Sequence, residues 1–475
     1  MALKRAPVPA ETAETSLEAK LRARTARVAV IGLGYAGLPM AIELGRAGFP
    51  ILGFDVDRDR VACINRGHSP VSNVADAEVS ALRTADRLVA SIDPADLDTA
   101  DVAIICVPTP LTAEGEPDLA FVEAAAETLA QHLHPEMLVA LQSTCGPGTT
   151  ARQLAPMLER ASGLRAGHDF YLVFAPERID PGNTRYTVSN TPKLIGGVSS
   201  ESTRLACLLY STCIADLVEV SSPDVAEMAK LVENTFRFIN ISFINEMALL
   251  CDRMGVNVWE VIEAARTKPF AFLAHYPSPG VGGHCIPVVP QYLAAAQLER
   301  GLATELIPAA NRINASMPRL VVDKLERALE MQGKVLLDAN VLVVGVTYKP
   351  DVADIRESAA IRVLEEALTR GARVAYHDPL TPTLTLAGDT VSSVPLTRDE
   401  LAAQDAVLLL TPHTSVDYDL IVNAAPLVID THSGLRPRRG PHVFNIWDPL
   451  AWDHQGREAA PRRPRSSNGA TRSRV

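Results

Sequence analysis

The residues with the clearest chemical potential lie in the segment GGHCIPVVP at residues 282–290. Cys285 stands there as a lone cysteine, and an accessible cysteine thiol is a strong nucleophile. Far upstream, Gly32, Gly34 and Gly37 form the pattern GxGxxG, which is typical of a dinucleotide-binding loop when it joins a strand to a helix. A thiol near a nicotinamide can trap an aldehyde covalently, which permits two successive oxidations of one alcohol without release of the intermediate.

A single cysteine is more often a buried, inert residue than a nucleophile. Gly282 and Gly283 before Cys285, and Pro287 after it, favour a shaped loop over a packed core. We assign the core interpretation to the other six cysteines, which have no CxxC pair and no spacing that indicates a metal site: Cys63, Cys106, Cys145, Cys207, Cys213 and Cys251. An odd number of cysteines without a framework predicts reduced thiols in a cytoplasmic protein.

The glycine pattern lies in the context that a dinucleotide site requires. It follows the apolar run at residues 27–31 and precedes an apolar helical stretch that extends to about Ala47. Asp55 ends the next predicted strand, where a carboxylate can accept hydrogen bonds from ribose hydroxyls and repel a 2′-phosphate. NAD is therefore favoured over NADP, although the nearby Arg58 and Arg60 would suit a 2′-phosphate. A glycine-rich turn without a ligand is the alternative.

Several polar residues follow predicted strands or share a helix face. Thr109 in the segment VPTP and Thr144 in STCGPGT could line a cofactor or a substrate, but turn chemistry explains these residue types equally well. Lys230 and Asn234 are four residues apart on a predicted long helix, so they share one face and could bind a developing oxyanion. From spacing alone, a solvated helix face is the more common explanation.

A second group of charges lies near the C-terminal part of the chain. Lys349 follows a predicted strand, and Arg356 lies close to the start of the next predicted helix. A lysine and an arginine beside strand ends suit a phosphate-bearing ligand, although surface charge alone would explain them equally well.

The elements that would position these residues indicate an α/β protein. Strand-like and helical runs alternate up to about residue 200, helical periodicity dominates residues 201–330, and the alternation resumes from residue 340. We expect two Rossmann-like doubly wound domains joined by a long central helical region. The expected parts are a disordered segment at residues 1–25, a dinucleotide-binding domain at 26–200, a helical linker and dimerisation domain at 201–330, a second Rossmann-like domain at 331–452, and a disordered basic tail at 453–475.

Within these parts, particular elements can be placed. Residues 225–254 are expected to form one long helix, and Met317 with Pro318 is a plausible start for another helix. Residues 341–344 and 358–369 are expected to form a strand and a helix of the second α/β unit, with Gly371 as a C-terminal cap.

Composition excludes several other classes of protein. The 475 residues carry a formal net charge of −11, which argues against a general nucleic-acid binder. Hydrophobic content of 47% and charged content of 21% are those of an ordinary globular protein. No apolar run approaches the roughly 18 residues of a membrane span, and residues 1–25 lack the apolar core of a signal peptide. We therefore expect a cytoplasmic protein without a nucleic-acid or membrane partner.

Taken together, the motifs resemble those of the nucleotide-sugar dehydrogenase family, the UDP-glucose and UDP-N-acetyl-hexosamine 6-dehydrogenases. The matching stretches, in order, are GLGYAGLP, VPTP, QSTCGPGTT, FAPERIDPGN, AEMAKLVENTFR, TKPFAF, PGVGGHCIP and TYKPDVADIRES. They cover roughly residues 26–450. The segments TKPFAF and PGVGGHCIP most resemble those of the bacterial UDP-N-acetylglucosamine 6-dehydrogenase branch.

The resemblance implies an activity and a role for each candidate residue. The family oxidises the primary alcohol of a UDP-sugar to a carboxylate with two NAD⁺ and one water, usually as a dimer. Cys285 would be the nucleophile, and Lys230 and Asn234 would stabilise the oxyanion. Thr144 and Glu177 would position water and assist proton transfer. The remaining assignments are cofactor binding by Gly32, Gly34, Tyr35, Gly37, Asp55, Thr109 and Thr144, and nucleotide-sugar binding by Lys230, Asn234, Gly282, Lys349 and Arg356.

The chain departs from the family pattern at a position that bears on the chemistry. Val289, four residues after Cys285, stands where the family has Asp, and a valine can neither accept a proton nor bind water. Smaller departures are Ala353, where the branch usually has Asp, and His432, where Arg is common. Val289 keeps open an alternative function, in which the chain binds NAD and nucleotide sugar but is inactive or stalls before hydrolysis.

Overall fold

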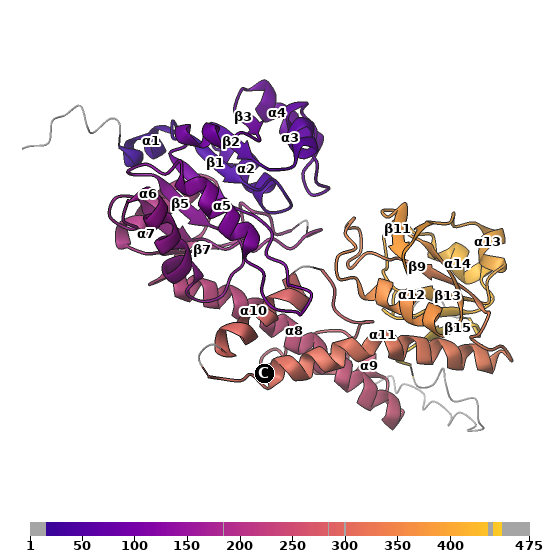
Figure 1. The fold of residues 1–475 in the computed structure, drawn as a ribbon. Coiled ribbons are helices and arrows are strands. Elements are labelled where there is room, and N and C mark those ends of the chain that lie inside the picture. Colours follow the sequence, from indigo (N-terminus) through magenta and orange to yellow (C-terminus); the bar gives the residue numbers. More distant parts are fainter. Residues whose placement is uncertain (1–15, 184, 284, 299–300, 436–439, 449–475) are drawn as a thin grey trace, which may run out of the picture.

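The computed structural model describes residues 16–183, 185–283, 285–298, 301–435 and 440–448. Its two β-sheet units are connected by the long helices α8, α10 and α11 (Figure 1). The mixed α/β class and the plan of two Rossmann-like units with helices between them are confirmed. The expected basic tail at 453–475 lies outside the described residues.

The first unit is built on an eight-stranded sheet, counted over the described residues, with the order β3-β2-β1-β4-β5-β6-β7-β8. All neighbouring pairs are parallel except β6 and β7. The strands are β1 (Val28–Ile31), β2 (Ile51–Phe54), β3 (Leu88–Ser91), β4 (Val102–Ile105), β5 (Leu138–Leu141), β6 (Tyr171–Phe174), β7 (Lys193–Gly197) and β8 (Leu217–Glu219). Because β8 belongs to this sheet, the sheet extends beyond the boundary expected at residue 200.

Helices cover both faces of this sheet, which is why its central strands are apolar on both sides. Val28 and Val30 of β1 pack into one buried cluster, whereas Ala29 and Ile31 pack into another. The helical elements of this unit are α1 (Leu17–Ala23), α2 (Gly37–Arg46), α3 (Arg58–Asn65), α4 (Asp76–Thr84), η2 (Pro94–Thr99), α5 (Ala120–Ala130), η3 (Thr149–Leu154), α6 (Ala155–Ser162) and α7 (Ser200–Tyr210).

The N-terminal helix α1 corrects one expectation. Residues 1–25 were expected to be disordered, but residues 17–23 form a helix whose Leu17 and Leu21 are buried against α7 and the first sheet. The Ser16 side chain accepts a hydrogen bond from the Ala19 N–H and caps the helix. Residues 1–15 lie outside the described part of the chain.

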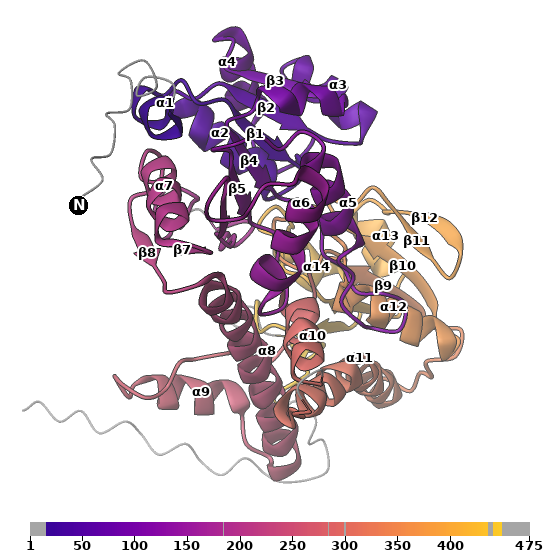
Figure 2. The same ribbon diagram turned by 60° about the vertical axis from the view of Figure 1, so that its left-hand side comes forward.

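The central region consists of α8 (Pro223–Met254), α9 (Val258–Arg266), α10 (Cys285–Leu298) and α11 (Leu306–Met331). The long helix expected at residues 225–254 is confirmed as α8, and α10 lies beside it (Figure 2). The expected helix start at Met317 and Pro318 is wrong, because α11 runs through Pro318. A buried face at Ile307, Ala310, Asn314, Met317 and Val321 continues across the proline, so packing outweighs a cost of about 3 kcal/mol for an interior proline.

The second unit contains a five-stranded parallel sheet with the order β10-β9-β13-β14-β15, again within the described residues. Its elements are β9 (Asn340–Val344), α12 (Ala359–Thr369), β10 (Arg373–His377), the hairpin β11 (Thr383–Leu386) and β12 (Asp389–Ser392), α13 (Arg398–Ala402), β13 (Ala406–Leu409), α14 (Tyr418–Ala424), β14 (Val428–Asp430) and β15 (Val443–Asn445). The expected strand and helix at 341–344 and 358–369 are confirmed within one residue.

Candidate active site

The glycine loop between β1 and α2 has the shape that a dinucleotide requires. Gly32 has a φ of +92°, and an added Cβ would lie 2.8 Å from the Cys106 carbonyl oxygen. A Cβ on Gly37 would come within 1.8 Å of the Gly32 carbonyl oxygen, so this glycine permits the helix to pack against the loop. A Cβ on Gly34 would meet nothing within 4 Å, which leaves its backbone open to a pyrophosphate.

Asp55, directly after β2, is buried beside this loop. Its Oδ2 accepts a hydrogen bond from the Leu33 N–H at 2.7 Å, and its two oxygens accept hydrogen bonds from Arg60 Nη1 at 3.1 and 2.9 Å. Arg60 therefore neutralises Asp55, while Arg58 is exposed to solvent. The glycine loop and the carboxylate after β2 therefore lie side by side, as a dinucleotide site requires.

Two other predicted cofactor residues, Thr109 and Tyr35, differ in how far they are buried. Thr109 is buried next to Tyr292, whose hydroxyl donates to the Pro110 and Asp118 carbonyl oxygens. Tyr35 lies in the glycine loop, where its hydroxyl is 3.1 Å from Ser72 Oγ and 3.5 Å from the Ala353 carbonyl oxygen. Tyr35 thus connects the first unit with the second.

Cys285 occupies a position that the sequence did not predict. It is the first residue of helix α10, not part of an extended loop, and it is exposed. Backbone N–H groups in the first turn of a helix have no acceptor within the helix, so they are free to bind an oxyanion. The side chain of Asn234 donates from Nδ2 to the Cys285 carbonyl oxygen at 3.4 Å, which joins α8 to the start of α10.

Lys230 and Asn234 lie on the buried side of α8. They are 7% and 8% exposed, so the alternative of a solvated helix face is wrong. Lys230 is therefore a buried cation on the helix that contacts the Cys285 backbone. A cation and an amide on this face can stabilise negative charge on an oxygen held near the thiol.

The carboxylate of Glu177, three residues after the end of β6, is held by three donors. Oε2 accepts from Gln142 Nε2 at 2.8 Å, and Oε1 accepts from the N–H groups of Arg178 and Ile179 at 2.7 and 2.8 Å. Thr144 lies at the neighbouring strand end, after β5, and is partly buried. The structure thus places Thr144 and Glu177 at adjacent strand ends of one sheet.

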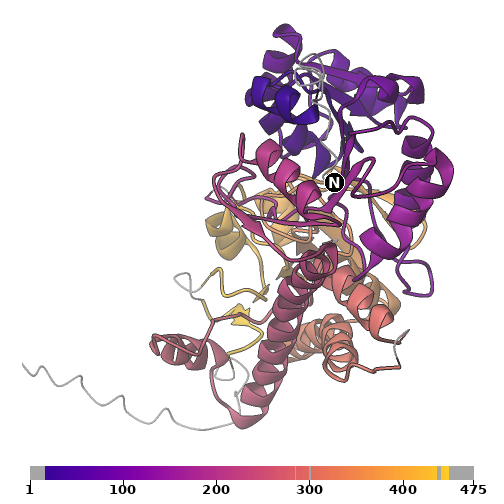
Figure 3. The ribbon, with the colours of Figure 1, turned by 90° about the vertical axis from the view of Figure 1, so that its left-hand side faces the viewer.

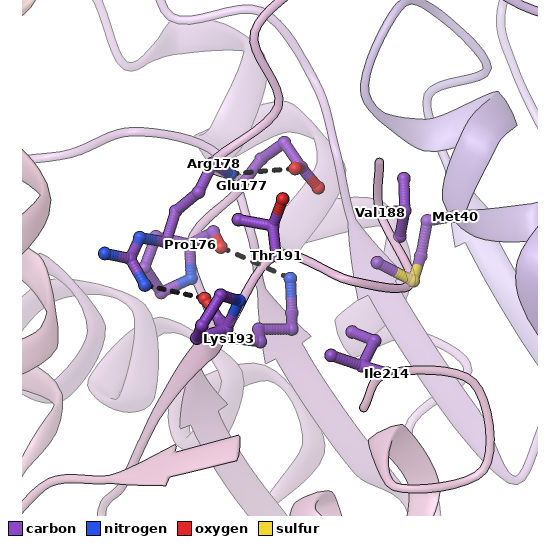
Figure 4. Close-up of a pocket in the computed structure, with 9 residues that line it drawn as sticks. Met40, Pro176, Glu177, Arg178, Val188, Thr191, Lys193 and Ile214 are labelled. Carbon is purple, nitrogen blue, oxygen red and sulfur yellow. Dashed lines mark hydrogen bonds between the residues drawn. The ribbon is translucent and has the colours of Figure 1, made fainter. Parts of the chain in front are cut away.

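A small cavity beside Glu177 contains a lysine that the sequence did not single out (Figure 4). Lys193 donates from Nζ to the Pro176 carbonyl oxygen at 3.2 Å, and its ammonium lies 5.0 Å from the centre of the Tyr210 ring. Burial lowers the pKa of Lys193. The only signal in the sequence was its place at the start of an apolar strand, where lysine is uncommon.

The predicted nucleotide-sugar residues lie where the two units meet. Lys349 Nζ donates to Asp180 Oδ1 at 2.7 Å and to the Pro181 carbonyl oxygen at 2.6 Å. The Arg356 guanidinium is paired with Asp354 and lies 5.6 Å from the centre of the Tyr35 ring. Both basic residues therefore contact the first unit from the second.

Gly282 lies in the loop before α10 and lines a second cavity, together with Thr347, Tyr348, Ser358 and His432. A Cβ on Gly282 would lie 2.8 Å from both the Glu357 carbonyl oxygen and the Tyr348 Cβ, so only glycine allows this close approach. Burial lowers the pKa of His432.

Val289 lies one helical turn after Cys285 and is 1% exposed. It packs in an apolar cluster with Leu231, Tyr292 and Ile307. The position one helical turn after Cys285 is therefore shielded from water, and its side chain provides no proton acceptor.

The structure also bears on metals and membranes. Among the described residues, no group of three or more His, Cys, Asp or Glu side chains is arranged to hold a metal ion. None of the helices in the described ranges is long and apolar enough to cross a membrane.

Comparison with known proteins identifies three consecutive family domains. The family models of the UDP-glucose/GDP-mannose dehydrogenase family match residues 26–214 as the NAD binding domain, 224–316 as the central domain, and 342–437 as the UDP binding domain. The UDP-N-acetyl-D-mannosamine dehydrogenase of Pyrococcus horikoshii is 38% identical over 74% of this chain and 83% of its own length. The UDP-N-acetyl-D-glucosamine 6-dehydrogenase of Pseudomonas aeruginosa is 36% identical over 74% of this chain and 82% of its own length.

Solved structures of nucleotide-sugar dehydrogenases also superimpose on this chain. The UDP-D-ManNAc dehydrogenase of Pyrococcus horikoshii superimposes with a TM-score of 0.78 at 34% identity, over 86% of this chain and 95% of its own. A UDP-glucose dehydrogenase from the archaeon Pyrobaculum islandicum superimposes with a TM-score of 0.79 at 27% identity, over 89% and 98% of the two chains.

Proposed function

This chain belongs to the UDP-glucose/GDP-mannose dehydrogenase family, and on that premise we propose that it oxidises the 6-hydroxymethyl group of a UDP-N-acetyl-hexosamine to the uronic acid. Membership of this family makes the chain an NAD-dependent UDP-sugar 6-dehydrogenase. What we propose is the identity of the sugar and the covalent route through Cys285. Relatives named for UDP-N-acetylglucosamine and UDP-N-acetylmannosamine support an N-acetylated sugar over UDP-glucose.

The position of Cys285 is the observation that supports the covalent route. Its thiol is exposed at the first turn of α10, and the Asn234 side chain reaches its backbone from α8. When bound, NAD⁺ would supply the hydride acceptor for two rounds of oxidation at C6 of the sugar. Between the rounds the Cys285 sulfur bonds to C6 of the aldehyde as its S–H bond breaks, and O6 takes up the proton released from the thiol to give a thiohemiacetal.

The second round leaves a thioester on Cys285, which water must cleave. The water oxygen bonds to C6, the C–S bond breaks, and the sulfur leaves as a thiolate. Lys230 and Asn234 hold the negative charge on O6 in the tetrahedral intermediate. Thr144 orients the water, and the Glu177 carboxylate takes its proton.

Substrate binding is the role we propose for the residues at the junction of the two units. Lys349 and Arg356 supply positive charge for the diphosphate, and Gly282 lines the cavity that we assign to the sugar. Substrate must then compete with Asp180 for Lys349 and with Asp354 for Arg356.

An NADH-release screen tests this function. The candidates are UDP-glucose, UDP-N-acetylglucosamine, UDP-N-acetylmannosamine and TDP-glucose, with the product mass measured for each. We expect NADH and a uronic acid from an N-acetylated UDP-sugar, loss of turnover in Cys285→Ala, and normal turnover in the matched control Cys207→Ala. Full activity in Cys285→Ala would overturn the covalent route.

A second candidate function rests on the dry environment of Val289. In this case the chain binds NAD and the nucleotide sugar but stalls at the thioester, because no carboxylate lies one turn after the thiol. Intact-mass spectrometry after one turnover distinguishes the two functions. A lasting sugar adduct on Cys285 supports the stalled protein, whereas a free thiol with uronic acid in solution supports the full reaction.

We also propose that the protein is a homodimer through α8. This helix projects from the first sheet unit (Figure 3) and carries exposed apolar side chains at helical spacing: Val225, Met228, Val232, Phe236, Phe243, Leu250 and Met254. Light scattering on Phe236→Glu/Phe243→Glu is expected to give a monomer, whereas Phe121→Glu on α5 keeps the dimer. A monomeric wild type would contradict this assignment.

The cytoplasm is the compartment we propose for the reaction. All seven cysteines are free, including the proposed nucleophile, and a reducing compartment keeps thiols in this state. Fractionation of the source cells with an antibody to the chain tests the assignment, and recovery outside the cytoplasmic fraction would refute it.

A further inference from the structure

Glu227 of α8 is a fully buried carboxylate, at 0% exposure. It accepts four hydrogen bonds: Oε2 from the Gly148 N–H at 2.5 Å, and Oε1 from the Thr150 N–H at 2.8 Å, the Thr150 hydroxyl at 2.6 Å and the Cys145 thiol at 3.5 Å. All four donors come from the segment 145–150, which follows β5 and includes the first two residues of η3. One side chain of the central helix therefore fixes a loop of the NAD-binding unit.

The hydrogen bonds replace contacts that the loop cannot make by itself. Gly148 is the N-cap of η3, has a φ of +99° and has no side chain to cap the helix. The first N–H groups of a helix lack acceptors within that helix, and a carboxylate stabilises them both by hydrogen bonding and by its charge. Glu227 supplies this cap from another helix. Burial raises the pKa of Glu227, so the four donors are what keep a charged form tolerable there.

The two elements that Glu227 joins carry different parts of the proposed chemistry. Thr144, which we propose to orient the water, directly precedes the segment that Glu227 holds. Lys230 and Asn234 follow Glu227 by one and two turns on the same buried face of α8. Asn234 in turn contacts the Cys285 backbone. The distance from Thr144, at the proposed water site, to Lys230 and Asn234, at the proposed oxyanion site, therefore depends on how the segment 145–150 packs against α8.

We propose that Glu227 is a positioning residue for the hydrolytic step. It keeps Thr144 at a fixed distance from Lys230 and Asn234. Glu227 itself touches neither substrate nor cofactor in this arrangement. It acts by keeping the water near C6 of the thioester on Cys285, where a shift of about 1 Å is enough to slow a reaction strongly. The inference rests on the proposed function, since it assigns Glu227 to one step of that reaction.

The variant Glu227→Gln tests the inference, because its amide has nearly the same shape. One of its two terminal atoms is an NH₂ donor, which must face the N–H of either Gly148 or Thr150. We expect hydrogen–deuterium exchange across residues 143–154 to rise at least tenfold and kcat to fall at least tenfold with little change in KM. Because hydrolysis slows most, a sugar adduct should accumulate on Cys285 by intact mass.

Two further variants separate positioning from general destabilisation. Asp252→Asn removes another carboxylate of α8, one paired with Lys324 at 2.7 Å, and is expected to leave both the exchange at 143–154 and the adduct level unchanged. Glu227→Asp keeps the charge on a shorter side chain, so it should fall between the wild type and Glu227→Gln, and it serves as the test if Glu227→Gln does not fold.

The possible outcomes are distinguishable. Unchanged exchange at 143–154 in Glu227→Gln would overturn the inference whatever the activity, because exchange needs no substrate. Faster exchange with no adduct, and with KM altered as strongly as kcat, would show a purely structural role and also overturn it. A wild type that releases no NADH from any nucleotide sugar would instead refute the proposed function.

Discussion

Replacing Gly34 with alanine separates folding of the glycine loop from cofactor binding. An added Cβ at Gly34 would meet no protein atom within 4 Å, and the φ of Gly34 is not in the left-handed region. Gly37→Ala is the matched contrast, because its Cβ would lie 1.8 Å from the Gly32 carbonyl oxygen. The two substitutions add the same methyl group at positions three residues apart, one into open space and the other into the backbone of the loop.

The magnitudes follow from this geometry. Alanine at a compatible glycine position stabilises a protein by about 0.4–1 kcal/mol, because it restricts the unfolded chain. We therefore expect Gly34→Ala to melt at or slightly above the temperature of the wild type. The same methyl group would keep the pyrophosphate from the backbone, and we expect NAD affinity to fall at least tenfold, or about 1.4 kcal/mol. Gly37→Ala should lose roughly 1–3 kcal/mol or more of stability through overpacking.

Thermal unfolding without ligand and calorimetric titration with NAD measure both effects. Wild-type NAD affinity in Gly34→Ala would refute the assignment of the loop to the pyrophosphate. A clearly lower melting temperature in Gly34→Ala would show instead that the space around Gly34 is needed for folding. Wild-type stability in Gly37→Ala would contradict the close packing of α2 on the loop.

Three further predictions concern other parts of the molecule. Leu21→Ala should cost about 2–5 kcal/mol of unfolding free energy, since Leu21 is fully buried, and an unchanged denaturant midpoint would show that α1 does not pack as described. Burial opposes ionisation of Asp378, but hydrogen bonds from His413 and backbone N–H groups prevail and lower its pKa below 3.8. The stability that Asp378 contributes is therefore present above about pH 4 and lost as the pH falls through the folded-state pKa, and Asp378→Asn should flatten acid unfolding curves in that window. Val289→Asp should lower the melting temperature by burying a carboxylate among apolar side chains and should shorten the lifetime of the Cys285 adduct; an unchanged lifetime would show that a carboxylate at this position does not assist hydrolysis.

The sequence predicted the parts of the site that depend on local pattern. GxGxxG between an apolar strand and a helix, with Asp55 at the next strand end, implied a geometry that the structure has. The shared helix face of Lys230 and Asn234 was also predictable from spacing, but its burial was not, because burial depends on what packs against α8. Cys285 was expected in a loop because glycine and proline surround it. Proline is tolerated in the first turn of a helix, where its missing N–H has no acceptor to satisfy, and α10 begins there.

Long-range contacts account for what the sequence did not reveal. The helix α1 is short, and such helices are stable through tertiary packing of one face, here Leu17 and Leu21. Glu227 and Lys193 are single charged residues, and charged side chains are usually exposed, so residue type alone predicted exposure for both. The position of Glu227 three residues before Lys230 on one helical face was the available signal.

The ratio of NADH to uronic acid tests the central claim, double oxidation through a thioester on Cys285, most directly. With the sugar that supports turnover, NADH is counted by absorbance, and the acid and any free aldehyde by mass spectrometry in the same reaction. We expect two NADH for each uronic acid and no free aldehyde. One NADH for each sugar, with aldehyde released into solution, would contradict it.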